Sequence, residues 1–167
     1  MATLHFVFGL PGAGKTTLAR ELADRERGLV FIEDEWVAQV MTAPITSIAE
    51  YREIGRRVRA LIEPLAERAL RIGVDVVFDF AANTKADRAW VRGIFERAGA
   101  DHVLHVIDAD VEVCRARVHQ RNRERPAGLY FGEVSDALFD AVVPHIVRPA
   151  DDEGFRVSDA GQSARAK

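Results

Sequence analysis

The sequence Gly9-Leu10-Pro11-Gly12-Ala13-Gly14-Lys15-Thr16 fits the pattern G-x-x-x-x-G-K-S/T, which is typical of loops that bind phosphate groups. Residues 4–8, before the loop, are mostly bulky and apolar and predict a buried strand. Residues 17–25, after the loop, place their apolar side chains on one side of a predicted helix. The pattern therefore occurs between a strand and a helix, which is the context that it requires, and a chance glycine turn explains it poorly.

Each residue type in this loop has a physical role toward a nucleotide. Glycines allow the tight turn that brings backbone N–H groups close to phosphate oxygens, and the following helix directs the positive end of its dipole at them. Lys15 is predicted to bridge the β- and γ-phosphates of ATP, and the Thr16 hydroxyl is predicted to bind Mg²⁺. The residues expected to contact the nucleotide are Gly12, Ala13, Gly14, Lys15, Thr16 and Thr17.

Length and composition indicate one ordinary domain. The 167 residues, 48% of them hydrophobic, supply enough apolar material for a single core, which we place at residues 1–158 with a frayed tail at 159–167. The net charge of −3 argues against a nucleic-acid-binding surface. One cysteine, Cys114, and no leader or membrane-spanning pattern lead us to expect a cytoplasmic protein without a membrane partner.

A cluster of acids follows the second predicted strand, residues 29–32, in the segment Glu33-Asp34-Glu35-Trp36. Carboxylates at the carboxyl end of a strand lie where open α/β sheets bind ligands, and one of them can accept the proton of an attacking hydroxyl. Alternatively, Asp34 or Glu33 caps a helix over residues 36–41. The pattern favours the two interpretations equally.

Residues 48–72 show the three- and four-residue spacing of a long helix, which Pro64 is expected to kink or split. One face of this helix carries Arg52, Arg56 and Arg59. Such a row either meets an anionic substrate or, more commonly, pairs with nearby acids, here Glu50, Glu53 and Glu63.

Residues 74–79 form an apolar run that ends in Asp79, as in the Walker B strand of nucleotide-binding proteins. We expect Asp79 to hold Mg²⁺ beside Thr16. A helix is predicted from Asn83-Thr84, with Thr84 and Asp87 forming a capping box and Gly99 ending it. Asn83 is either a cap or a substrate contact.

Residues 100–107 predict a further strand, in which His102 and His105 face opposite sides and cannot share a metal. The other histidines show no ligand spacing, and we expect no structural zinc. Two short elements complete the prediction, a helix at 133–143 and a final strand at 155–157.

An arginine-rich helix is predicted from residue 111 to about residue 123, with Asp110 as its cap. Its arginines, with one just beyond its end, are Arg115, Arg117, Arg121, Arg123 and Arg125. Because crowded guanidinium groups need an anion or acids to neutralise them, a triphosphate is a suitable ligand, and the loop 126–128 suits a lid. The alternative is a solvated helix, which the phosphate-binding loop makes the weaker interpretation.

Together these segments resemble the small P-loop kinases, and most closely the AAA-family ATP-binding or polynucleotide-kinase-like group, with its relatives of chloramphenicol phosphotransferase and zeta-type toxins. The resemblance covers nearly the whole chain. It is carried by GLPGAGKTT (9–17), IEDEW (32–36), VVFDFAANTKADR (76–88), RARVHQRNRER (115–125) and PADDEGF (149–155). It implies a three-layer α/β fold with a five-stranded parallel sheet flanked by helices and an arginine-rich lid.

The same resemblance implies roles for individual residues. Asp34 matches the acid that acts as base or orients the acceptor hydroxyl. Arg117 matches an arginine that packs on adenine, and Arg121 matches one that meets phosphates. The chain departs from the group after the third strand, where Asp79 is followed by Phe80 instead of alanine. We expect Phe80 to reshape the acceptor pocket, so the resemblance does not identify the acceptor.

These observations favour an ATP- and Mg²⁺-dependent phosphotransferase that acts on a hydroxyl of a small molecule, either a metabolite or an antibiotic-like compound. Lys15, Asp34 and Arg121 are the expected catalytic residues, and Thr16 and Asp79 the expected metal ligands. Two alternatives remain open: a polynucleotide 5′-hydroxyl kinase, and a nucleotide-binding regulator that transfers nothing.

Overall fold

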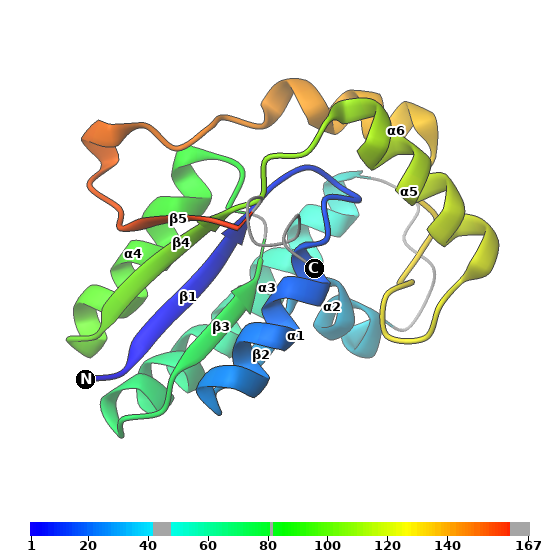
Figure 1. The fold of residues 1–167 in the computed structure, drawn as a ribbon. Helices are drawn as coiled ribbons and strands as arrows, with labels where there is room; N and C mark the ends of the chain where they lie inside the picture. Colours follow the sequence, from blue (N-terminus) through cyan, green and yellow to red (C-terminus); the bar gives the residue numbers. More distant parts are fainter. Residues whose placement is uncertain (42–47, 81, 161–167) are drawn as a thin grey trace.

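The computed structural model describes residues 1–41, 48–80 and 82–160. Its centre is one sheet of parallel strands in the order β2-β3-β1-β4-β5 (Figure 1). The strands are β1 (Thr3–Phe8), β2 (Leu29–Ile32), β3 (Val76–Asp79), β4 (Asp101–Val106) and β5 (Val157–Asp159). The predicted α/β fold with a five-stranded parallel sheet is therefore confirmed.

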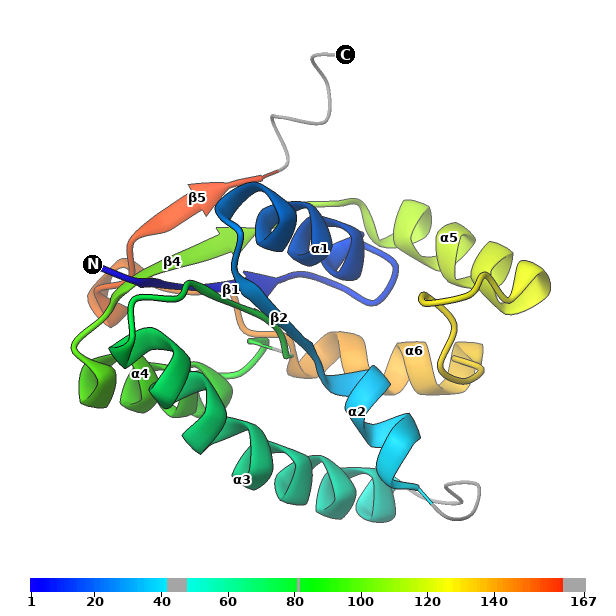
Figure 2. The same cartoon turned by 90° about the horizontal axis from the view of Figure 1, so that it is seen from below.

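Helices cover both faces of this sheet. They are α1 (Lys15–Glu26), α2 (Glu33–Val40), α3 (Ile48–Arg71), α4 (Lys85–Ala98), α5 (Val111–Glu124) and α6 (Asp136–Val142), with short 3-10 turns η1 (Val143–His145) and η2 (Asp151–Glu153). Figure 2 shows α3 and α4 on one side of the strands and α1 on the other. Among the described helices, none has the length and apolar character needed to cross a membrane.

Alternating strand residues pack into hydrophobic clusters on the two faces of the sheet. The larger core joins Leu4, Phe6 and Phe78 of the strands to apolar residues of α3 and α4. On the opposite face, Val77 packs against α1, on Ala19, Leu22 and Ala23. Because parallel strands must be covered on both faces, this arrangement gives the three layers of the fold.

Helix α2 begins earlier than predicted, at Glu33 instead of Trp36. Its N-cap is Ile32, which makes no side-chain capping bond, so neither Glu33 nor Asp34 is the cap. The three acids occupy the first turn, where they stabilise the positive end of the helix dipole. The predicted N-cap position was therefore wrong, although the acids do open the helix, as the alternative interpretation expected.

Pro64 does not split α3, which is assigned as one helix across it. Proline removes the hydrogen bond to the carbonyl of residue 60, and both Pro64 and Ala60 are exposed, so water can bind that carbonyl instead. The last strand also differs from the prediction, because β5 starts at Val157. Phe155 instead packs edge-on against Phe6, with ring centroids 5.4 Å apart.

Several local predictions are confirmed. Thr84 and Asp87 form the capping box of α4, and Gly99 ends that helix in the left-handed conformation. Asp110 caps α5 by accepting hydrogen bonds from two backbone N–H groups. His102 and His105 lie on opposite faces of β4. His102 stacks on Phe95, and His105 contacts His5 on the neighbouring strand β1. Helix α6 is shorter than predicted and starts after Ser135, its cap. Residues 161–167, most of the expected tail, lie outside the described residues.

Candidate active site

The phosphate-binding loop connects β1 to α1. Gly12 and Gly14 adopt left-handed backbone conformations, with φ of 80° and 100°, which glycine tolerates without strain. A Cβ atom at Gly12 would also collide with the carbonyl oxygen of Cys114 on α5. The glycine pattern therefore serves two purposes, since it turns the chain and lets the arginine-rich helix pack directly on the loop.

The Lys15 ammonium lies inside this loop. It donates hydrogen bonds to the carbonyl oxygens of Gly9 and Leu10, at 2.9 and 3.0 Å. Burial lowers the pKa of Lys15, while the charges of Asp79 and then Asp34 oppose that shift. Arg121 adds to the lowering, because a second positive charge nearby disfavours the protonated amine. Two predicted acids and one predicted arginine therefore act on the same lysine.

Thr16 and Asp79 meet at the carboxyl end of β3. The Thr16 hydroxyl donates to Asp79 Oδ2 at 2.5 Å, and Asp79 is 9% exposed. Burial raises the pKa of Asp79, and Lys15 and the Thr16 hydrogen bond oppose the shift. A hydroxyl and a carboxylate are oxygen ligands of the kind that Mg²⁺ prefers, and Mg²⁺ uses few protein ligands beside water and phosphate. This pair therefore fits Mg²⁺ bound together with a nucleotide.

The acids at the end of β2 have different environments. Glu33 is buried and accepts a hydrogen bond from Arg59 Nε at 3.0 Å. Asp34 is exposed, and its charge raises the pKa of both Lys15 and Asp79. Of the two neighbouring carboxylates, Asp34 is thus the one whose charge acts on Lys15 of the phosphate-binding loop, whereas Glu33 joins α2 to α3 through Arg59.

The arginines of α3 are paired with acids where the structure gives their contacts. Arg56 binds Glu53 through two hydrogen bonds of 3.0 and 2.9 Å, as the sequence predicted for this row. Arg59 also donates to Asp87 on α4 at 2.7 Å, a partner that the sequence did not suggest. Glu63 was expected to pair with the row but accepts from Trp90 Nε1 at 2.7 Å instead. Arg59 therefore joins α3 to α2 and α4, whereas Arg56 makes a local pair on the surface of α3.

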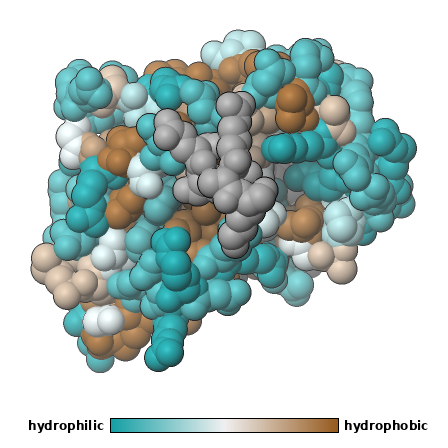
Figure 3. Space-filling model, in the orientation of Figure 1, coloured by the Kyte–Doolittle hydropathy of each residue, from teal (hydrophilic) through white to brown (hydrophobic). Residues whose placement is uncertain are grey.

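The arginines of α5 form two groups. Arg115 pairs with Asp136 and Asp140 of α6, and Arg125 lies over the ring of Tyr130. Arg121 has a buried Nε that finds no hydrogen-bond partner among the described residues. Arg117 is exposed, and its charge lowers the pKa of Cys114 against the dominant effect of burial. The surface over α5 is mostly hydrophilic (Figure 3). Within the described residues neither Arg117 nor Arg121 pairs with an acid, so the pair that the sequence singled out is available to an anion, as is the exposed Arg123.

Two residues after β3 differ from expectation. Phe80 is 1% exposed and packs against the rings of Phe78 and Trp90, which stack on each other, so it fills the core and does not line an acceptor pocket. Asn83 is not the helix cap, since Thr84 has that role. The Asn83 side chain instead accepts a hydrogen bond from the backbone N–H of Gly9 at 3.4 Å. Asn83 therefore supports the start of the phosphate-binding loop.

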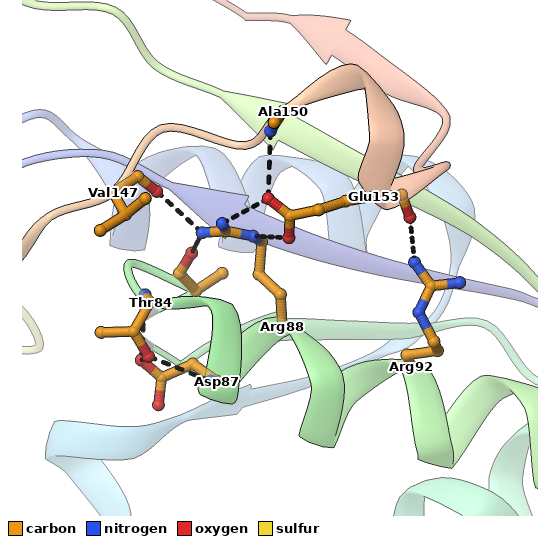
Figure 4. Close-up of polar contacts among 8 residues, drawn as sticks. Thr84, Asp87, Arg88, Arg92, Val147, Ala150 and Glu153 are labelled. Carbon is orange, nitrogen blue, oxygen red and sulfur yellow. Dashed lines mark hydrogen bonds and ion pairs between the residues drawn. The ribbon is translucent and has the colours of Figure 1, made fainter.

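Two important arginines were missed from the sequence. Arg20 lies one helical turn after Thr16, and its charge lowers the pKa of Asp79, so the four-residue spacing was an available signal. Arg88 is fully buried and binds both carboxylate oxygens of Glu153 at 2.7 Å. Figure 4 shows the Arg88 side chain extending from α4 to the segment that carries Val147 and Glu153. Arg88 lies three residues before the buried Val91, and this spacing places both on the buried face of α4.

The parallel sheet, the strand–loop–helix and the lysine within the loop define a nucleotide-binding protein with the P-loop kinase fold. Residues 4–141 match the AAA domain family (AAA_33), and the chain belongs to this family. The predicted resemblance to the P-loop kinase group is thereby confirmed. A comparison with curated proteins gave no match.

Solved structures support the same fold. A protein from Chloroflexus aurantiacus J-10-fl, provisionally described as a kinase, is 20% identical with a TM-score of 0.75, over 99% of this chain and 89% of that one. A chain of the Pnkp1/Rnl/Hen1 RNA repair complex is 20% identical with a TM-score of 0.65, over 86% of this chain and 43% of that one. The APS kinase CysC of Mycobacterium tuberculosis, in complex with AMPPNP and APS, is 18% identical with a TM-score of 0.59, over 98% and 94%. At such identities the similarity establishes the fold.

Proposed function

We propose that this protein transfers the γ-phosphoryl group of ATP to a hydroxyl group of a small molecule. The observation that carries the proposal is the position of Lys15 inside the loop, beside the hydrogen-bonded pair of Thr16 and Asp79. The charges of Asp79, Asp34 and Arg121, which come from three other parts of the chain, all act on this lysine. Binding a nucleotide alone needs no acid at the position of Asp34. The solved structure of APS kinase with AMPPNP and APS, which has the same fold, supports a kinase activity.

The triphosphate would lie in the loop of residues 9–16. Backbone N–H groups and the start of α1 bind its oxygens, and Lys15 exchanges its two carbonyl contacts for the β- and γ-phosphates. Arg121 offsets charge that develops on the transferred group, because its Nε has no other hydrogen-bond partner among the described residues. Arg117, one turn earlier on α5, is the proposed contact for adenine.

Thr16 and Asp79 would hold Mg²⁺. The Thr16 hydroxyl would then turn from Asp79 toward the ion, and Asp79 would bind it directly or through water. When bound, the ion supplies positive charge that offsets the charge of the phosphate oxygens. Burial of Asp79 supports this role, since a buried carboxylate whose pKa is raised gains from a nearby cation.

Asp34 would act on the acceptor. The acceptor oxygen forms a bond to the γ-phosphorus while the bond from that phosphorus to the bridging oxygen of ADP breaks. The proton of the acceptor hydroxyl moves to the Asp34 carboxylate, and ADP leaves with the electron pair of the broken bond. The exposed position of Asp34 supports this role, because an acceptor must reach the carboxylate from solvent.

The variant Asp34→Asn tests this assignment. We expect it to keep the ATP affinity of the wild type and to lose phosphoryl transfer by about 100-fold or more, because an amide cannot accept the proton. Calorimetry measures the affinity, and labelled ATP measures the transfer. Asp24→Asn, an exposed acid on α1, is the matched control and should transfer at the wild-type rate. Unchanged turnover in Asp34→Asn would remove Asp34 from the mechanism.

The acceptor class needs a separate experiment. Labelled ATP is incubated with a pool of small metabolites and, in parallel, with single-stranded oligonucleotides that carry a 5′-hydroxyl. We expect label in the metabolite fraction. Label on the oligonucleotide would identify a polynucleotide kinase, the alternative that the similarity to a chain of an RNA repair complex keeps open despite the net charge of −3. Label on neither acceptor, with ATP bound, would favour a nucleotide-binding regulator.

A further inference from the structure

Arg20 contacts two segments that are far apart in the sequence. It lies on α1, and its Nη2 donates a hydrogen bond of 3.1 Å to the carbonyl oxygen of Gly128, in the loop between α5 and α6. The same nitrogen lies 3.5 Å from a carboxylate oxygen of Glu35, in the first turn of α2. One guanidinium group thus lies between the proposed lid loop and the helix that carries Asp34.

The loop that Arg20 touches is anchored at its base. The Asn122 side chain donates to the carbonyl of Val134 at 2.8 Å and accepts from the N–H of the same residue at 3.3 Å. At the tip, Gly128 has φ of 74°, and a Cβ atom there would lie 3.5 Å from Arg20 Nη2. The loop is therefore attached at one end by Asn122 and at its tip by Arg20.

Arg20 follows Thr16 by one turn of α1, so it lies on the same side of the helix as this proposed metal ligand. In addition, its buried Nε has no hydrogen-bond partner among the described residues. The ion pair with Glu35 does not explain Arg20 as a residue that stabilises the fold. The Arg20 and Glu35 side chains are 41% and 48% exposed, and such exposed pairs contribute little to the free energy of folding.

We propose that Arg20 is a positioning residue. It holds two segments close to the phosphate-binding loop: residues 126–132, in the connection between α5 and α6, and the first turn of α2. This proposal rests on the proposed function, because residues 126–132 follow α5, which carries Arg121, and the first turn of α2 carries Asp34. Arg20 reaches both from α1, whose first residues belong to that loop. Small displacements of reacting groups have large effects on transfer rates, so the contact acts on turnover more than on binding.

The variant Arg20→Ala tests the proposal. We expect its affinity for ATP to stay within about threefold of the wild type and its ATP hydrolysis, with water as the acceptor, to fall by about tenfold or more. Hydrogen exchange of the backbone amides in residues 126–132 and 33–36 should become faster with ATP and Mg²⁺ present. Arg25→Ala, on the same helix and bound to Glu26, is the matched control and should change none of these readouts.

A second variant, Glu35→Gln, keeps Arg20 and its bond to Gly128. It should speed exchange only in residues 33–36, because the tie to α2 alone is weakened. Exchange and hydrolysis in Arg20→Ala that match Arg25→Ala would overturn the proposal. So would a loss of ATP affinity as large as that of Lys15→Ala, since Arg20 would then be a nucleotide ligand. If the wild type neither hydrolyses nor transfers, the proposed function fails, whereas the exchange experiment still decides whether Arg20 holds the two segments.

Discussion

The phosphate-binding loop and a group of ion-paired residues, the ion-paired frame, differ in the partners that their charged side chains have. We use the term ion-paired frame for Glu33, Arg59, Asp87, Arg88 and Glu153. In the loop, Lys15 is held by backbone carbonyls only five and six residues away, and burial lowers its pKa. In the frame, every arginine meets carboxylates 26 to 65 residues away in the sequence. The loop therefore holds a charged group among backbone carbonyls, whereas the frame pairs opposite charges that join different elements.

Glu33 and Asp34 show the boundary between the two regions. They are adjacent in α2, yet Glu33 accepts from Arg59 in the frame and Asp34 acts electrostatically on Lys15 in the loop. Consecutive helical residues point about 100° apart around the axis, so the two carboxylates have different surroundings. The frame therefore holds the first turn of α2, the turn that also carries the proposed catalytic acid.

The largest expected effect comes from breaking the frame at Arg88. Arg88→Ala should lower the free energy of unfolding by about 3 to 5 kcal/mol, because it removes the partner of a mostly buried carboxylate. It also removes donors to the carbonyls of Ala82 and Val147 (Figure 4). Chemical denaturation monitored by circular dichroism measures the change.

An arginine with a half-exposed side chain provides the control for Arg88. Arg71 pairs with Glu67 with 51% of its side chain exposed, and Arg71→Ala should change the free energy of unfolding by less than about 1 kcal/mol. Equal losses in Arg88→Ala and Arg71→Ala would show that the buried frame contributes no more than a surface pair, contrary to the comparison.

The next effect separates binding from stability in the loop. Lys15→Ala should weaken ATP binding by on the order of 100-fold, which is about 2.7 kcal/mol, because the ammonium no longer meets the phosphates. It should not lower the free energy of unfolding without ATP, because desolvation of this charge opposes folding. Calorimetry and denaturation test the two statements, with Lys85→Ala, an exposed lysine on α4, as the control. An ATP affinity equal to that of the wild type would place the nucleotide elsewhere.

The smallest effect distinguishes the regions by pH. His105 on β4 contacts His5 on β1, the strand that leads into the loop, with their ring nitrogens 3.0 Å apart. Burial, and then the charge of His5, lowers the pKa of His105 from 6.5 to about 4. The unfolded chain therefore binds the proton first, so stability is complete above pH 6.5 and is lost as the pH falls toward 4. Between pH 7 and pH 5 we expect a loss of about 1 to 2 kcal/mol.

The frame should respond only to stronger acid. Hydrogen bonding to Arg88 lowers the pKa of Glu153 from 4.5 to about 2, so its contribution is complete above pH 4.5 and disappears toward pH 2. Denaturation curves at a series of pH values check both windows. His105→Gln should flatten the change between pH 7 and pH 5, and a slope unchanged by this substitution would assign the loss to other groups.

The parts of the fold that were predicted correctly depend on neighbours in the sequence. The loop with its strand and helix, the capping box of Thr84 and the cap at Asp110 each involve residues at most a few positions apart. Element boundaries failed where a tertiary contact overrode the pattern. Phe155 has the apolar character of a strand residue but packs on Phe6 before β5 begins.

Within the candidate site, motif residues were identified and their supports were not. Lys15, Thr16 and Asp79 follow from residue type and spacing, because their chemistry requires those types after particular strands. Arg20 and Arg88 have no such requirement, since a buried or bridging arginine is defined by its partners. Phe80 was misjudged for the same reason, because its burial beside Trp90 depends on how α4 packs on the sheet.

Residue order alone thus established a phosphate-binding loop in a parallel α/β sheet, since a strand, a turn and a helix that follow one another interact locally. Folding determined that the charge of Asp34 acts on Lys15 while Glu33 binds Arg59, that Arg20 joins two segments, and that Arg88 binds Glu153. These outcomes depend on partners up to 108 residues away and on burial, which no local pattern contains.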